Sequence, residues 1–188
     1  MAGQYLRFDE VEDVLSSLDL LAHCAPLLSK KPSYWKWAII SGHAALQGAM
    51  VCALHDTSNL SVLDKISTRK MREWYDQPTG DPPQERLAYF NTLLERCRAS
   101  DHMKGQPLNL SPSQLKDIGR LHNEFRNGFT HFVPQGWSIA KAGLPRIVCA
   151  AVDATEMLMA HPNVTYKLTG YRRRRLASSL AIVRARLG

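Results

Sequence analysis

The segment Arg126-Asn127-Gly128-Phe129-Thr130-His131 brings together residue types that suit phosphate-ester chemistry. An arginine is always cationic, and its planar set of N–H donors matches the oxygens of a phosphate group. A histidine has an ordinary pKa of about 6.5, so near neutral pH it can either accept or give a proton. Arg126 is therefore the candidate phosphate-binding residue and His131 the candidate acid–base residue. The amide of Asn127 can orient the imidazole or a sugar.

These residues lie near the end of a segment that the sequence predicts to be a helix. Ser111, Pro112 and Gln114 supply an N-cap, a favoured first helical residue and a capping box. The helix is expected to continue to about Phe132 and to stop before Pro134. One long helix then positions every residue of the candidate site.

On a helical wheel with a step of about 100° per residue, this segment has an apolar and a polar face. The face expected in the core contains Leu115, Ile118, Leu121, Phe125, Phe129 and Phe132. The opposite face contains Asn123, Glu124, Arg126, Asn127, Thr130 and His131. A glycine inside a helix costs about 1 kcal/mol relative to alanine. Gly128 therefore indicates a close approach to the backbone, such as a second subunit or a sugar-phosphate strand.

The pattern Arg-Asn-x-x-x-His near the end of an amphipathic helix, with aromatic residues interleaved, resembles the signature of the HEPN superfamily. The matching and flanking residues are Phe125, Arg126, Asn127, His131 and Phe132, and the helical pattern extends the resemblance over residues 34–161. Members with an intact motif are typically metal-independent endoribonucleases of bacterial toxin–antitoxin, abortive-infection and CRISPR systems. They usually build a composite cleft from two motif helices. The resemblance implies RNA as the substrate, a homodimer, and an antitoxin protein as a candidate partner.

RNA carries its own nucleophile, the 2′-hydroxyl. We expect His131 to transfer protons and Arg126 to hold the phosphate and its developing charge. Because transesterification uses both an acid and a base, a two-fold interface that brings a second Arg126/His131 set opposite the first is expected. Such a reaction leaves a 2′,3′-cyclic phosphate and needs no metal or cofactor.

Two further groups of residues are candidates for substrate binding. The first group shares the polar face of the motif helix and consists of Asn123, Glu124 and Thr130. The second is a basic run near the C-terminus, Arg172, Arg173, Arg174 and Arg175. With a net charge of +7, such a run could bind phosphates without sequence preference. A solvated helix face, or a dimer contact to the acidic N-terminal helix, explains the run equally well.

Other sequence features do not indicate further chemistry. His122 lies on the apolar arc and is expected to be a buried histidine with a satisfied hydrogen bond. His43, Cys52 and His55 lack the spacing of metal ligands. A phosphate-binding glycine loop, a nucleophile elbow and a zinc pattern are absent from the sequence, which argues against an ATPase, a serine hydrolase and a metalloenzyme.

The cysteine pattern and the hydropathy favour a cytoplasmic protein. Cys24, Cys52, Cys97 and Cys149 are widely spaced, and no secretory signal is visible, so reduced thiols are expected. The longest apolar run, residues 38–54, is too short and too interrupted to span a membrane and favours a buried helix.

Apolar residues recur at helical spacing along the rest of the chain. Besides the motif helix, we predict helices at residues 8–23, 34–54, 60–75, 84–98, 144–161 and 171–187. Residues 78–83 and 100–109 are loops that contain Pro and Gly. Little of the sequence alternates with period two, so no sheet is expected.

The chain is therefore predicted to be a single all-α domain over residues 1–188. We expect a HEPN-like bundle of about six or seven helices, with a core at residues 34–161 and a basic C-terminal helix at residues 171–187. The function stays open between a ribonuclease that acts as a toxin or phage-defence effector and a non-catalytic module that binds a nucleotide or a protein.

Overall fold

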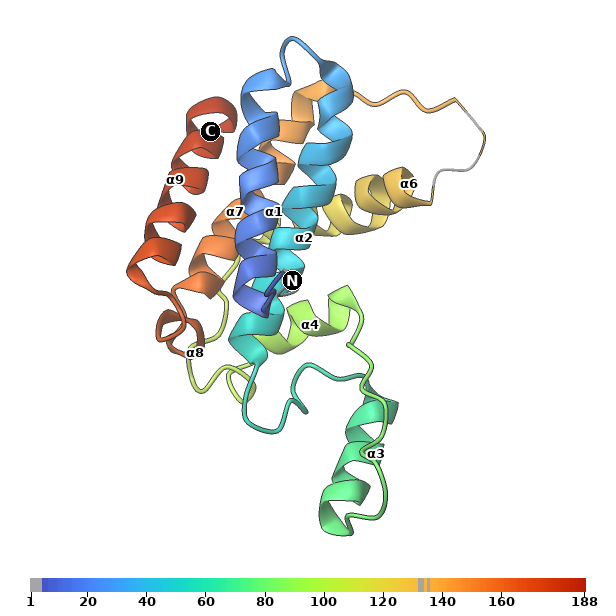
Figure 1. Ribbon diagram of the computed structural model, residues 1–188. Coiled ribbons are helices and arrows are strands. Elements are labelled where there is room, and N and C mark those ends of the chain that lie inside the picture. The colour runs from blue at the N-terminus through green and yellow to red at the C-terminus, as the bar shows by residue number, and fades with distance from the viewer. Residues whose placement is uncertain (1–4, 132–133, 135) are drawn as a thin grey trace.

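The computed structural model describes residues 5–131, 134 and 136–188, and their structure is all-α (Figure 1). The α-helices are α1 Glu10–Cys24, α2 Trp35–Leu54, α3 Lys65–Asp76, α4 Phe90–Cys97, α5 Pro112–Arg120, α6 Asn127–Thr130, α7 Leu144–Met159, α8 Pro162–Thr165 and α9 Gly170–Leu187. A π-helix, η3 Leu121–Arg126, joins α5 to α6. Short 3-10 helices lie at Ala25–Leu27, Pro32–Tyr34 and Lys141–Gly143. The described residues form no strand, which confirms the prediction of an all-α fold.

Side-chain caps fix where several helices begin. The Asp9 carboxylate accepts the Glu12 N–H at 2.8 Å at the start of α1. Asp64 caps α3 in the same way, and Thr169 caps α9. Each cap satisfies an N–H group that has no partner within its helix.

Helices α3 and α4 begin later than the apolar spacing predicts. Residues 60–64 and 84–89 are not helical, because their backbones pair with each other. The Asp64 N–H donates to the Arg86 carbonyl at 2.9 Å, and the Ala88 N–H donates to the Val62 carbonyl at the same distance. This pairing uses N–H and carbonyl groups that a helix would require. The predicted helices at residues 60–75 and 84–98 were therefore too long at their starts.

Helix α2 lies at the centre of the bundle and packs against α1, α7 and α4. In Figure 1, α1, α2, α7 and α9 run side by side, and α3 extends away from them. The hydrophobic core also includes side chains from outside residues 34–161. Helix α1 contributes five side chains that are fully buried, Val11, Val14, Leu15, Leu18 and Leu21. Helix α9 adds Leu180 and Val183.

The segment Pro32–Leu54 is long and apolar enough to cross a membrane, with a mean hydropathy of 1.4. Its most apolar stretch is 72% buried inside the protein. This burial is what the core helix of a soluble protein requires, and it agrees with the prediction of a buried helix. Cys24, Cys52 and Cys97 are buried as free thiols, and Cys149 is half-buried.

Candidate functional site

The motif helix is built from three consecutive pieces: α5, η3 and α6. Its start is as predicted, because the Ser111 side chain accepts the Gln114 N–H at 3.2 Å and Gln114 accepts the Ser111 N–H at 3.0 Å. The prediction of a uniform α-helix to Phe132 is wrong. Residues 121–126 form a π-helix, and α6 ends at Thr130. Phe132 lies outside the described residues.

The π-helical turn changes which side chains share a face. A π-helix closes its hydrogen bonds over one more residue than an α-helix, so a wheel with a constant step fails across it. Ile118, Leu121 and Phe125 are buried as predicted, but Arg126 and Asn127 are half-buried and do not lie on a fully solvated face. Single π-helical turns are frequent at functional sites.

The Arg126 guanidinium is held by its own neighbours. Its Nη1 donates to Asn127 Oδ1 at 2.9 Å, so the Asn127 amide orients the arginine. The prediction had this amide orienting the imidazole or a sugar. Thr130 Oγ1 donates to the Arg126 carbonyl at 2.9 Å, and Arg126 and Thr130 line the same pocket. The arginine is therefore fixed at the edge of a cavity before any ligand binds.

His131 is the first residue beyond α6. Its N–H donates to the Asn127 carbonyl at 2.9 Å, and its backbone then leaves the helix with φ −113° and ψ 47°. The side chain is exposed, so the imidazole faces solvent and is not packed in the core. The structure thus places Arg126, Asn127 and His131 at the end of one helical segment and leaves the histidine accessible to a ligand.

The other candidates on the motif helix differ in their availability. Asn123 and Thr130 are exposed. Glu124 forms a two-bond ion pair with Arg120, with Nε–Oε2 at 2.9 Å and Nη2–Oε1 at 3.3 Å. This pair lies on the helix surface, so Glu124 is already engaged within its own helix.

Gly128 has a packing partner within the chain. A Cβ atom at this position would lie 2.6 Å from Cη2 of Trp137 and 2.9 Å from its Cζ3. The indole also packs against Phe129, with ring centroids 4.8 Å apart. The close approach that a glycine implied is therefore made by Trp137 of the same chain.

A pair of histidines lies next to Arg126 and was not among the predicted site residues. His43 Nε2 and His122 Nδ1 are 2.9 Å apart, and both rings stack on Phe90 at centroid distances of 4.5 and 4.4 Å. Burial lowers the pKa of His43 to about 3, and the charges of His122 and Arg126 add to the shift. Burial, followed by the charge of Arg126, also lowers the pKa of His122. Both rings are therefore neutral at pH 7.

Of this pair, only His122 could be anticipated from its sequence position. His122 was expected to be a histidine with a satisfied hydrogen bond, and it has one, although its ring is only half-buried. Its partner comes from α2, which packs against η3. Only that tertiary contact brings His43 to the site.

Arg126 and His43 open onto a pocket of about 690 Å³ between α1, α2 and the motif helix. Three carboxylates at the start of α1 and its N-cap lie along the pocket wall, Asp9, Glu10 and Asp13. The other lining residues are Phe8, Ile40, His43, Ala44, Gln47, Gly48, Val51, Leu87, Arg126 and Thr130. The pocket thus combines anionic, cationic and apolar surfaces.

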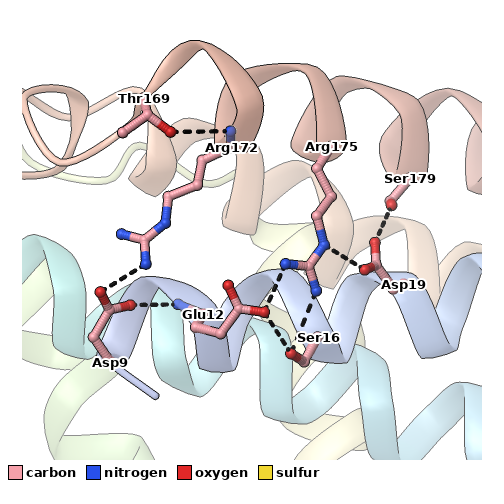
Figure 2. A network of polar contacts seen from close by, with 8 residues as sticks. All are labelled: Asp9, Glu12, Ser16, Asp19, Thr169, Arg172, Arg175 and Ser179. Carbon is pink, nitrogen blue, oxygen red and sulfur yellow. Dashed lines mark hydrogen bonds and ion pairs between the residues drawn. The ribbon is translucent and has the colours of Figure 1, made fainter. Parts of the chain in front are cut away.

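Most of the predicted basic run is engaged within the chain. Figure 2 shows Arg172 paired with Asp9 at 2.7 Å and Arg175 paired with both Glu12 and Asp19 at 2.6 and 2.5 Å. The remaining two members differ: Arg173 donates to the backbone carbonyls of Thr165 and Leu168, which precede α9, and Arg174 is exposed. The run therefore joins α9 to the acidic α1 of its own chain. Neither RNA nor a dimer is needed to explain it.

Within residues 5–131, 134 and 136–188, no three His, Cys, Asp or Glu side chains form a group that could hold a metal ion. Comparisons of the chain with protein-family models, with curated proteins and with solved structures found no match.

Proposed function

We propose that the chain is a metal-independent endoribonuclease of HEPN type that acts in the cytoplasm as a toxin or phage-defence effector. One observation carries the proposal. The arginine of the Arg-Asn-x-x-x-His motif is held at a pocket by Asn127, and the motif histidine is exposed at the end of the same helical segment.

In the proposed reaction, Arg126 binds the scissile phosphate and stabilises the charge that develops on it. Its position is set in advance by Asn127, so little conformational freedom is lost when RNA binds. His131 takes the proton from the ribose 2′-hydroxyl or gives one to the leaving 5′-oxygen. The oxygen of the 2′-hydroxyl attacks the phosphorus, the bond to the 5′-oxygen breaks, and a 2′,3′-cyclic phosphate remains.

A homodimer supplies the second proton-transfer group in this proposal. His43 and His122 bond to each other and are neutral, so neither is charged to act as the general acid at pH 7. A second exposed His131, brought by a two-fold axis, completes the acid–base pair. An antitoxin protein that covers the exposed imidazoles is the expected regulator.

The test is incubation of the purified protein with labelled tRNA and mRNA in EDTA. Wild type is expected to cut, and His131→Ala and Arg126→Ala are each expected to lose about 100-fold or more of the rate while keeping the helical circular dichroism spectrum. His23→Ala, which removes an exposed histidine of α1, is the matched control and should cut like wild type.

Cutting that survives both motif substitutions would overturn the proposal. RNA binding without cutting by wild type would identify the alternative, a non-catalytic nucleotide-binding module.

A further inference from the structure

The pocket beside Arg126 has one carboxylate without a partner. Asp9 is paired with Arg172 at 2.7 Å, and Glu10 accepts a hydrogen bond from Lys167 at 2.5 Å. The Asp13 carboxylate makes no hydrogen bond or ion pair with any residue that the structure describes. Asp13 is an exposed residue, and partial burial of its carboxylate raises its pKa. This unpaired acceptor at the pocket wall is available to a ligand that brings N–H donors.

Gly48 sets the position of this carboxylate. A Cβ atom at Gly48 would lie 2.9 Å from Asp13 Oδ2 and 2.9 Å from a Val14 methyl group. Only a residue without a side chain allows α1 to approach α2 this closely. Asp13 therefore lies where α1 contacts α2, on the wall of the pocket.

A ring nitrogen of a buried histidine also reaches this pocket. The His43 side chain is 3% exposed, and its Nε2 is used by His122. Its Nδ1 has no partner among the described residues. Every fully buried side-chain nitrogen or oxygen atom in this part of the chain does have a partner, so Nδ1 is not fully buried. Nδ1 therefore reaches the space that His43 lines, where it can bond to a ligand.

The remaining walls suit a flat ring. Ile40 and Leu87 supply apolar surface, and Phe8 is 55% exposed at the pocket wall, where its ring can stack on a base. A volume of about 690 Å³ accommodates a mononucleotide. Arg126 offers a guanidinium to a phosphate at the same cavity.

We infer that this pocket binds the guanosine nucleotide whose phosphate Arg126 holds, with the Asp13 carboxylate accepting both N–H groups of the guanine Watson–Crick edge. This inference rests on the proposed function for the role of the phosphate. Guanine is favoured because its N1–H and its 2-amino group are adjacent donors, which match the two oxygens of a carboxylate. Adenine and cytosine place a ring nitrogen acceptor beside their amino group, and uracil has a single N–H between two carbonyls.

The experiment is isothermal titration of the full chain with guanosine, inosine, adenosine and uridine 3′-monophosphates. The guanosine nucleotide is expected to bind about tenfold or more tightly than each of the others. Inosine monophosphate is the sharpest comparison, because it lacks only the 2-amino group. Asp13→Asn should remove this preference. Arg126→Gln should weaken all four nucleotides alike.

Asp101→Asn, an exposed loop carboxylate outside the pocket, is the matched control and should keep the preference. Gly48→Ala gives a second route, because it displaces Asp13 without changing the carboxylate, and it should reduce the preference for guanosine. Equal affinities for the four nucleotides in wild type, or a preference that survives Asp13→Asn, would overturn the inference.

This outcome is separate from that of the nuclease assay. Selective guanosine binding by a protein that cuts no RNA would support the pocket and refute the ribonuclease. RNA cutting together with unselective nucleotide binding would support the ribonuclease and refute the guanosine pocket.

Discussion

Acidification from pH 7 to pH 5 should destabilise the fold through His43. The native state keeps this buried ring neutral down to a pKa of about 3, whereas the unfolded chain protonates it near the ordinary value of 6.5. Between these values the unfolded state binds more protons than the native state, so the free energy of unfolding falls as the pH falls. At about 1.4 kcal/mol per pH unit, the loss from pH 7 to pH 5 reaches about 2 kcal/mol.

Urea unfolding of wild type and His43→Gln at both pH values measures this contribution. The variant loses the contact to His122, so its free energy of unfolding at pH 7 is lower than that of wild type. Between pH 7 and pH 5, however, this free energy should fall by about 2 kcal/mol less in the variant than in wild type. Carboxylates are present in both proteins, so their titration cancels in the comparison. His23→Gln, at an exposed position of α1, should behave like wild type. The same pH sensitivity in His43→Gln and wild type would refute a neutral, buried His43.

Two matched pairs of variants test the packing that positions the site. Gly48→Ala should be less stable than Gly119→Ala by about 1–3 kcal/mol, because a methyl group at Gly48 lies 2.9 Å from Val14 whereas one at Gly119 meets nothing within 4 Å. The gain in helix propensity is common to both, so equal urea midpoints would contradict the close approach of α1 and α2. Arg175→Gln should cost about 1–3 kcal/mol by breaking its bonds to two carboxylates of α1, while Arg174→Gln, at an exposed position, should cost less than about 0.5 kcal/mol. Equal thermal stability of the two arginine variants would show that the α1–α9 ion pairs contribute nothing.

Local signals predicted most of the helices and failed where distant residues intervene. The capping box at Ser111 and the acidic first turn of α1 are short-range features, and both lie where the sequence placed them. The pairing of residues 60–64 with residues 84–89 is not encoded in either segment alone, and it shortened two predicted helices. The π-helical turn η3 lies where the motif helix packs against α2, and a constant helical step cannot anticipate it.

The candidate site divides in the same way. Arg126, Asn127 and Thr130 contact one another because they are neighbours along one helix, so sequence spacing was sufficient to group them. His43 and Asp13 belong to other helices and reach the pocket only through tertiary packing. The charge complementarity of the two chain ends was visible in the sequence, but charge alone could not choose between RNA, a second subunit and the chain's own α1.

The chemical ends of the cut RNA test the central proposal most directly. Mass spectrometry of a defined RNA oligonucleotide incubated with the protein in EDTA should find 2′,3′-cyclic phosphate ends for wild type and none above background for Arg126→Ala or His131→Ala. Products with a free 3′-hydroxyl, or cyclic phosphate ends formed as fast by His131→Ala as by wild type, would contradict attack by the 2′-hydroxyl with proton transfer by His131.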